Sequence, residues 1–184
     1  MYNIADYQNV DSSVQETYDD IMKHLGHEGL VDYFKVLGHY NPHILDTTWS
    51  LLKSVLLQGV LPRSLKELVF VAISNEKDCT YCTEIHTALC KMLDINESTL
   101  QAVLTKSPNI NPRKLKLAID FAMKAAIHSN QITEADHDVL LNAGMTEEEI
   151  FELMSLASVV NYSNSLSQSM MVGVDADIQS FLNR

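Results

Sequence analysis

Residues 62–93, PRSLKELVFVAISNEKDCTYCTEIHTALCKML, decide the fold that we expect. Pro62 favours a helix start, and the apolar residues after it recur three and four positions apart, as they do on one face of a helix. Asp78 or a neighbouring residue can cap a second helix, which we expect to run from about Cys79 to Leu93. The stretch therefore predicts two consecutive helices joined by a short polar turn.

The rest of the chain shows the same helical pattern. Its apolar residues are spaced for helices, and Thr146 with Glu149 matches a capping box, in which two side chains cap one helix start reciprocally. No convincing alternation typical of strands occurs, and the sequence contains no Asn-Gly or Asp-Gly hairpin signal. The sequence therefore predicts an all-α fold. Further helix starts are indicated at Asn41-Pro42, Asn96, Asn111-Pro112 and Thr133.

Two pairs of segments resemble each other at the same offset of fifty residues. LPRSLKEL at 61–68 pairs with NPRKLKLA at 111–118, and LDINESTL at 93–100 pairs with AGMTEEEI at 143–150. A duplicated helical unit would explain both matches, although helix starts can also look alike without common origin. In a second copy the positions of Cys79, Cys82 and His86 would hold Ser129, Ile132 and Asp136, so only the first copy would carry chemistry.

Composition excludes several classes of partner. The chain has 184 residues, enough for one well-packed domain or two small halves, and its hydrophobic share of 46% is ordinary for a globular protein. The net charge is −11 with no stretch rich in Lys or Arg, so nucleic acid and anionic membranes are poor partners. The polar start is not a secretory signal, and the longest unbroken apolar run is only Leu68 to Ile73. We therefore expect a cytoplasmic protein.

Cys79, Cys82 and His86 form a Cys-x-x-Cys-x-x-x-His pattern. On a helix with about 100° per residue, their side chains would fall within an arc of about 60°. A helix start favours the thiolate form, and a histidine one turn later can accept or carry the proton. A reducing compartment and an odd count of three cysteines disfavour a static disulfide. The pattern favours a working thiol pair with its own base, and two incidental core cysteines are the structural alternative.

Zinc binding is a further alternative for these residues. Cys90 would be the fourth ligand after His86, but Cys82 and Cys90 are separated by about 12 Å along a straight helix. Tetrahedral zinc needs each ligand within about 2.3 Å of the metal, so ligands would have to come from elsewhere, such as His39 or His43. We therefore expect no metal, and we interpret Cys90 as a small buried apolar residue.

Glu67 is the nearby carboxylate that is hardest to place. It stands in LKELVFVAI, residues 65–73, a segment that is otherwise almost entirely apolar. On spacing alone, an acid at the solvated edge of the apolar stripe is favoured. A buried carboxylate would instead have a raised pKa and could exchange protons with His86.

Glu67 and the motif from Cys79 to His86 together resemble the signature of a known family. They are similar to the core of the alkylhydroperoxidase AhpD-like, or carboxymuconolactone decarboxylase-like, proteins. A weaker similarity continues over 144–164, so the resemblance covers about residues 40–175.

This resemblance implies an all-helical AhpD-like bundle that assembles as a trimer or hexamer and needs neither a metal nor an organic cofactor. The AhpD-like domain would occupy residues 41–184, with the core motif at 62–93 and a candidate degenerate second repeat at 112–172. Residues 1–40 would form an N-terminal helical extension, which could cover the site or a neighbouring subunit.

The resemblance also implies a thiol peroxidase. Cys82 would attack an organic hydroperoxide, Cys79 would resolve the sulfenic acid as a disulfide, and Glu67 with His86 would relay protons. An external dithiol, in the family a lipoyl group on an adaptor protein, would then restore the pair. Helix-dipole reasoning favours Cys79 as the thiol of lower pKa, whereas the spacing to His86 favours Cys82, which we take as the attacking thiol.

Two features of the sequence bear on whether the chain resembles the peroxidase branch or the decarboxylase branch of the family. Tyr81 stands where some peroxidase members carry a second relay histidine, so we expect simpler or slower proton delivery. The decarboxylase branch does not need paired cysteines, so Cys79 with Cys82 favours the redox branch. Two alternatives stay open: a decarboxylase-type enzyme in which His86 and Glu67 do acid–base work, and a non-enzymatic redox-sensing oligomer.

Overall fold

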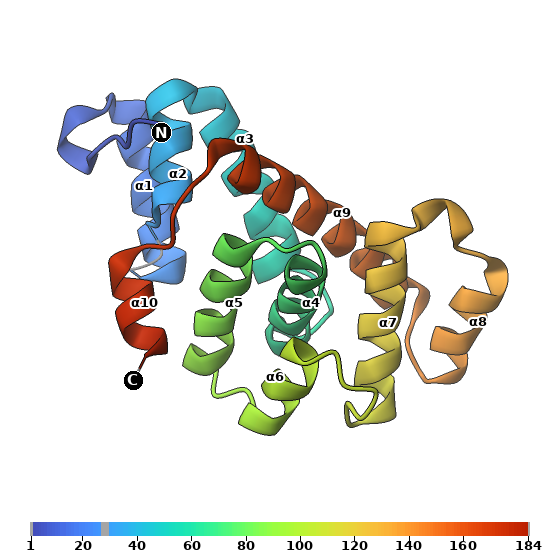
Figure 1. The fold of residues 1–184 in the computed structure, drawn as a ribbon. Coiled ribbons are helices and arrows are strands. Elements are labelled where there is room, and N and C mark those ends of the chain that lie inside the picture. The colour runs from blue at the N-terminus through green and yellow to red at the C-terminus, as the bar shows by residue number, and fades with distance from the viewer. Residues whose placement is uncertain (1, 27–29, 184) are drawn as a thin grey trace.

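All regular structure is helical in residues 2–26 and 30–183, the part of the chain that the computed structural model describes. The expected all-α fold is thus confirmed (Figure 1). Among the described helices, none combines the length and apolar composition needed to cross a membrane. The helices are α1 (Ser12–Leu25), α2 (Asp32–Tyr40), α3 (Pro42–Leu52), α4 (Arg63–Glu76), α5 (Thr80–Met92), α6 (Glu97–Leu104), α7 (Arg113–Ile127), α8 (Glu134–Asn142), α9 (Glu147–Met170) and α10 (Ala176–Leu182), with shorter turns η1 (Tyr7–Asn9), η3 (Lys53–Leu57) and η4 (Ser129–Gln131).

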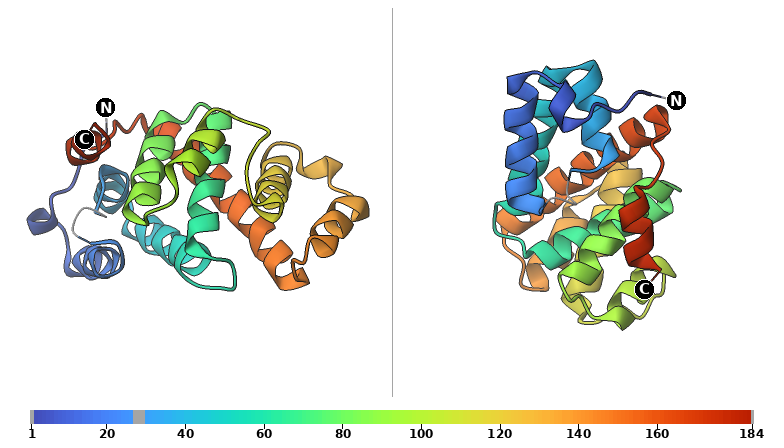
Figure 2. Two further views of the ribbon diagram at one scale, coloured as in Figure 1. Left: turned by 90° about the horizontal axis from the view of Figure 1, so that it is seen from below. Right: turned by 90° about the vertical axis from the view of Figure 1, so that its left-hand side faces the viewer.

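Helix α4 is the centre of the fold. Its residues 66–74 are all buried, whereas a helix at the surface buries only one stripe. Helices α5, α7 and α9 pack around it, and the long α9 passes behind α4 to reach α7 and α8 (Figures 1 and 2). A side chain on residues 66–74 of α4 therefore faces protein in every direction.

Segments from the N-terminal and C-terminal parts of the chain come together beside α5. Helices α1 and α2 pack against α3, and α10 packs against α5 (Figure 1). Asp175, just before α10, accepts a hydrogen bond from the backbone N–H of Asp32 at the start of α2, with an N···O distance of 2.9 Å. Segments far apart in sequence thus form one wall next to the helix that carries the cysteines. The boundary expected between residues 40 and 41 falls between α2 and α3, and as a domain boundary it stays a prediction.

Most predicted helix starts are confirmed, but two predicted caps are wrong. At α5 the N-cap position is held by Cys79, whose side chain makes no capping hydrogen bond, and α7 also lacks its expected cap. The side chain of Asn41 caps α3 by accepting from two backbone N–H groups at 3.1 Å each, and Thr146 with Glu149 forms the expected capping box. Asn111 does not cap α7. Pro112 is itself extended, with φ −71° and ψ 165°, so the helix begins at Arg113 and Asn111 is too far from its free N–H groups.

Helix boundaries repeat at the offset seen in the sequence. Helices α4 and α7 begin at Arg63 and Arg113, and α6 and α9 begin at Glu97 and Glu147, both fifty residues apart. These are similarities of boundary only, so the second repeat stays a prediction.

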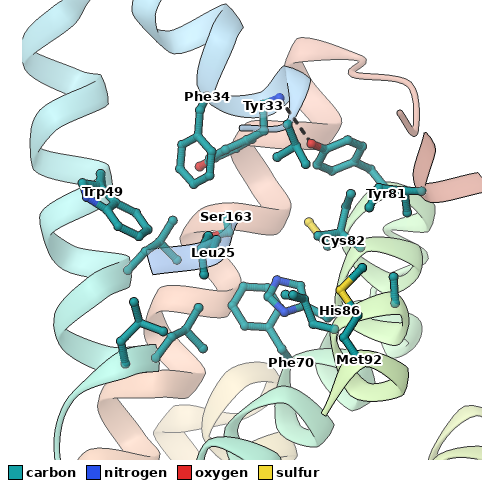
Figure 3. A pocket seen from close by; sticks show the side chains of 18 of the residues that line it. Leu25, Tyr33, Phe34, Trp49, Phe70, Tyr81, Cys82, His86, Met92 and Ser163 are labelled. Atoms are coloured by element: carbon teal, nitrogen blue, oxygen red, sulfur yellow. Dashed lines mark hydrogen bonds between the residues drawn. The ribbon is translucent and has the colours of Figure 1, made fainter. Parts of the chain in front are cut away.

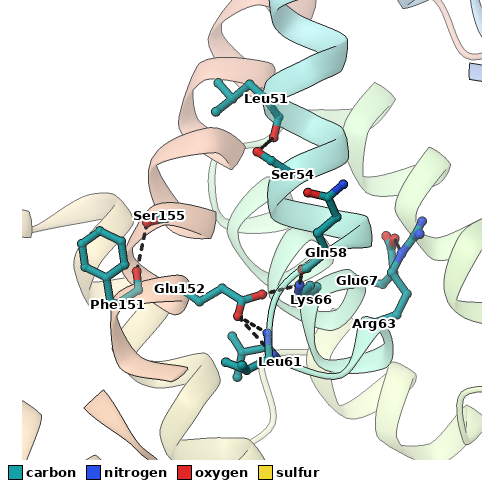
Figure 4. Close-up of polar contacts among 11 residues, drawn as sticks. Leu51, Ser54, Gln58, Leu61, Arg63, Lys66, Glu67, Phe151, Glu152 and Ser155 are labelled. Atoms are coloured by element: carbon teal, nitrogen blue, oxygen red, sulfur yellow. Dashed lines mark hydrogen bonds and ion pairs between the residues drawn. The ribbon is translucent and has the colours of Figure 1, made fainter. Parts of the chain in front are cut away.

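A buried ion pair ties α9 to the segment before α4 (Figure 4). The ammonium of Lys66, whose side chain is 2% exposed, pairs with the carboxylate of Glu152 and donates to the carbonyl of Gln58. The other oxygen of Glu152 accepts from the backbone N–H groups of Val60 and Leu61, at 2.7 and 3.1 Å. This pair fixes the loop that leads into the central helix.

We expect Glu152→Ala to lower the free energy of unfolding by about 3–5 kcal/mol, because it leaves the Lys66 charge buried without a partner. Urea unfolding followed by far-UV circular dichroism measures the change. Glu148→Ala, at an exposed position of the same helix, is the matched control and should change stability by less than about 0.5 kcal/mol. Equal unfolding midpoints for the two variants would contradict this account of the ion pair.

Candidate functional site

The two cysteines of the motif lie at the start of α5. Asp78 adopts a left-handed conformation with φ 53°, and the N–H of Cys79 donates to the carbonyl of Ser74 at 2.9 Å, which closes the end of α4. Cys79 is the residue before the first turn of α5, with φ −85° and ψ 84°. The helix expected from about Cys79 therefore begins one residue later, at Thr80, because the backbone of Cys79 is not helical. Both thiols are free and buried, with exposed fractions of 1% and 4%.

Ser167 of α9 contacts both sulfur atoms. Its Oγ lies 3.3 Å from the Sγ of Cys79 and 3.1 Å from the Sγ of Cys82, and Ser167 is 1% exposed. Sequence reasoning missed this residue. The available signal was the polar run NYSNSLSQ, residues 161–168, inside a helix whose preceding turns are mostly apolar.

Glu67, His86 and Arg63 form a connected polar cluster. The Nδ1 of His86 lies 2.5 Å from one carboxylate oxygen of Glu67, and the Nε of Arg63 donates to the other oxygen at 2.5 Å. Glu67 is 0% exposed, so the solvated acid favoured by spacing alone is wrong. The physical reason is that residues 66–74 of α4 are buried on all sides and offer no solvated edge. Arg63 was not predicted as a site residue.

The environment of Glu67 keeps it ionised. Burial alone would raise the pKa of this carboxyl group, but the charges and hydrogen bonds of His86 and Arg63 more than offset burial and hold the pKa below its ordinary value. A carboxylate at Glu67 accepts the Nδ1–H of His86, which leaves Nε2 as the nitrogen able to take or give a proton. The ring of His86 is also held by stacking on Phe70, with centroids 3.5 Å apart and planes at 13°.

An apolar cavity of about 90 Å³ lies against this cluster. Figure 3 shows Cys82 and His86 on one side of it, with Trp49 on the opposite side. Cys79 instead contacts α9 through Ser167. The cavity is lined by Leu25, Val31, Tyr33, Phe34, Trp49, Leu52, Leu56, Leu57, Arg63, Phe70, Tyr81, Cys82, Ile85, His86, Ala88, Leu89, Met92, Ser163 and Ile178.

Part of the cavity wall comes from the first 40 residues. The aromatic side chains of Tyr33 and Phe34 line it, and the backbone N–H of Tyr33 donates to the hydroxyl of Tyr81 at 3.2 Å (Figure 3). Tyr81 stands at the position where some peroxidase members of the family carry a second relay histidine. Here it joins α5 to α2. In this chain the first 40 residues therefore contribute to the wall of the cavity.

The paired thiols differ in acidity. A hydrogen bond from the Cys82 thiol is the largest cause that lowers the pKa of Cys79 to about 6; burial opposes it, while Ser167 and the positive charge of Lys77 add to it. The pKa of Cys82 is raised by its hydrogen bond with Cys79 and by burial. Near neutral pH the pair therefore carries one thiolate, favoured on Cys79, the thiol that the helix-dipole argument also favours.

The third cysteine is confirmed as a buried small residue. Cys90 is 0% exposed, and burial raises the pKa of its thiol to about 12. Across the described residues, no group of three or more His, Cys, Asp or Glu side chains is arranged to hold a metal ion. The thiol of Cys82 and the imidazole of His86 line the cavity, and His86 contacts the carboxylate of Glu67.

Comparisons with known proteins agree with this architecture. Residues 42–107 match the model of the Carboxymuconolactone decarboxylase family, a segment that includes Glu67, Cys79, Cys82 and His86. No curated protein matches the sequence.

Solved structures match nearly the whole chain. An uncharacterized peroxidase-related protein from Ralstonia eutropha JMP134, described as an alkylhydroperoxidase AhpD core, superposes with a TM-score of 0.87 at 19% identity, covering 96% of this chain and 93% of that one. A peroxidase-related protein from Silicibacter sp. TM1040 gives 0.82 at 19% identity, with 92% and 88% covered. The debrominase Bmp8, solved as a cysteine-to-alanine variant with 2,3,4-tribromopyrrole, gives 0.78 at 16% identity, with 94% and 90% covered. At these identities the similarity establishes the fold.

Proposed function

We propose that the chain, which resembles the AhpD-like and carboxymuconolactone decarboxylase-like proteins, is a thiol-dependent peroxidase that reduces organic hydroperoxides. The observation that carries the proposal is the apolar cavity that Cys82 lines together with His86, whose ring is held by Glu67. Cys79 is within reach as a second thiol through the shared contact with Ser167.

In the first step the sulfur of Cys82 attacks the terminal oxygen of the hydroperoxide. Cys82 must be a thiolate to react, so its proton passes to the Nε2 of His86. The S–O bond forms as the O–O bond breaks, and the leaving alkoxide takes a proton from the protonated His86 to become an alcohol. Glu67 supports this exchange because its negative charge stabilises the imidazolium form.

In the second step Cys79 attacks the sulfenic acid on Cys82. The S–S bond forms as the S–OH bond breaks, and the leaving hydroxide takes a proton that His86 relays from solvent, so that it departs as water. An external dithiol then reduces the disulfide by two exchange steps and becomes oxidised itself. The balance is one hydroperoxide and one dithiol converted to one alcohol, one water and one disulfide. A lipoyl group on an adaptor protein, and a trimeric or hexameric assembly, remain parts of this proposal.

The lining of the cavity favours organic over hydrogen peroxide. Its walls are almost wholly aliphatic and aromatic, with few polar groups, which include Arg63, His86 and Ser163. An apolar cavity gains binding free energy from the organic part of a hydroperoxide, in proportion to the apolar area removed from water. Hydrogen peroxide offers no such area.

We expect the purified protein to consume cumene hydroperoxide when supplied with dihydrolipoamide, and to form one alcohol per dithiol oxidised. Peroxide loss and product formation are followed by chromatography, with tert-butyl hydroperoxide and hydrogen peroxide in parallel. We expect kcat/KM to fall in the order aromatic, alkyl, hydrogen peroxide. Folded protein that turns over none of the three with dihydrolipoamide, dithiothreitol or a lipoylated protein would overturn the proposal.

A second candidate is reductive dehalogenation of a halogenated aromatic compound. The debrominase Bmp8 shares the fold and binds a tribromopyrrole, and the cavity here has aromatic walls beside Cys82. One aryl bromide and two thiols would give one arene, one hydrogen bromide and one disulfide. Bromide release from 2,3,4-tribromopyrrole, in the absence of peroxide turnover, would favour this candidate.

A further inference from the structure

The hydroxyl of Ser167 stands at the meeting point of three acceptors. Both sulfur atoms of the thiol pair lie within 3.3 Å of its Oγ, and the carbonyl oxygen of Asn164 lies 3.2 Å away on the same helix. All four residues are at most 4% exposed, so water does not compete for these contacts. A buried serine with one proton and three alternative acceptors can change its hydrogen bond as the charge around it changes.

The oxidation state of the thiols decides which acceptor is strongest. A thiolate carries a full negative charge and outcompetes a neutral carbonyl for the hydroxyl proton, because charge-assisted hydrogen bonds are roughly twice as strong as neutral ones. In a disulfide neither sulfur is charged, and the proton is better placed on the carbonyl of Asn164. The same hydroxyl therefore has a favourable partner in both states, but its bond is stronger in the reduced state.

We propose that Ser167 is a positioning residue for the Cys79–Cys82 pair, which stabilises the thiolate and so makes the disulfide easier to reduce. Its hydrogen bonds also hold the two sulfur atoms on one side of α5, facing α9. The effect on the thiols follows from the contacts alone. Its part in turnover rests on the proposed peroxidase function.

Few other groups near the thiols can stabilise the thiolate. The ammonium of Lys77, at the end of α4, is the positive group that acts on Cys79. Tyr33 of α2 and Tyr81 of α5 face Cys82, and burial raises the pKa of both, so they stay neutral. Within the described structure Ser167 is thus the hydroxyl that contacts both sulfur atoms.

The test compares wild type with Ser167→Ala in two measurements that need no peroxide. Thiolate absorbance at 240 nm, corrected with Cys79→Ser, gives the pKa of the pair, and equilibration with reduced and oxidised lipoamide gives the redox equilibrium. We expect the pKa to rise from about 6 by about one unit and the equilibrium constant for reduction to fall about tenfold, or ~30 mV. Ser158→Ala, which removes a hydroxyl of the same helix that donates to the carbonyl of Met154 and lies outside the cavity, is the matched control and should leave both values unchanged.

A second pair of variants covers the case in which Ser167→Ala does not fold. Ser167→Thr and Ser167→Val have the same shape and differ in the hydroxyl, so Thr should stay near wild type and Val should show the full shift. If the hydroxyl-free variants titrate and equilibrate as wild type does, the proposal is wrong. A shift in pKa and redox equilibrium without any peroxide turnover would uphold the role of Ser167 and count against the peroxidase function alone.

Discussion

Cys82→Ser is expected to abolish dithiol-dependent hydroperoxide consumption, down to the rate of dithiol and peroxide without protein. Cys82 is the thiol that lines the cavity, whereas Cys79 is 1% exposed and contacts α9, so a bound peroxide can meet the sulfur of Cys82. A serine hydroxyl is not ionised near neutral pH and cannot form the sulfenic acid on which the cycle depends. The measurement is initial peroxide loss with dihydrolipoamide in excess.

Cys79→Ser provides the contrasting control. It should also lose turnover, but it should still consume one equivalent of hydroperoxide and accumulate a sulfenic acid on Cys82, detectable by mass spectrometry after trapping with dimedone. Cys90→Ala, which changes a buried residue outside the cavity, should retain turnover. Sulfenic acid on Cys79 in the Cys82→Ser variant would reverse the two roles, since the lower pKa of Cys79 would then outweigh its position.

Glu67→Gln is expected to lower kcat/KM for hydroperoxide by about 10²–10⁴-fold, the range that positioned acid–base groups contribute. The glutamine amide keeps the shape but has no negative charge to stabilise protonated His86 or to fix its Nδ1–H tautomer. Steady-state kinetics across pH measures the effect. Glu76→Gln, near the end of the same helix and 40% exposed, is the matched control and should keep the wild-type rate.

The same pair of variants has a stability readout. Because the pKa of Glu67 is lower in the folded state than its ordinary value, its ionisation stabilises the fold above the unfolded pKa. That contribution should disappear as pH falls through the lower, folded-state pKa. Wild type should therefore lose stability relative to Glu67→Gln in that acid range. A rate for Glu67→Gln equal to that of Glu76→Gln would remove Glu67 from the proton relay.

The helices could be predicted because their signals are local. Apolar spacing and caps such as Asn41 and Thr146 depend on residues only a few positions apart, so they can be recognised in the sequence. The cap predicted at Asn111 was wrong because Pro112 is extended and α7 begins one residue later than expected. The sequence does not show these backbone angles. The start of α5 was likewise placed one residue early, since a left-handed turn at Asp78 puts Cys79 before the helix.

The site was only partly predictable because its members meet through tertiary packing. Glu67 looked like a surface acid until the family resemblance suggested otherwise, since spacing cannot show that residues 66–74 of α4 are surrounded on every side. Ser167 lies 85 residues from Cys82, and no local pattern connects the two. Arg63 could not be predicted as a site residue for a similar reason, because its contact matters only if Glu67, one turn later, is buried.

The residues that line the cavity come from two parts of the sequence, and these parts can change independently. Glu67, Cys82 and His86 lie within the segment matched by the family model, whereas six lining residues lie outside that segment. Substitutions among these six alter which molecules fit while the reacting groups keep their surroundings on α4 and α5. Substrate range can therefore diverge by mutation, or be redirected with a library confined to these positions, without rebuilding the chemistry. They are Leu25, Val31, Tyr33, Phe34, Ser163 and Ile178.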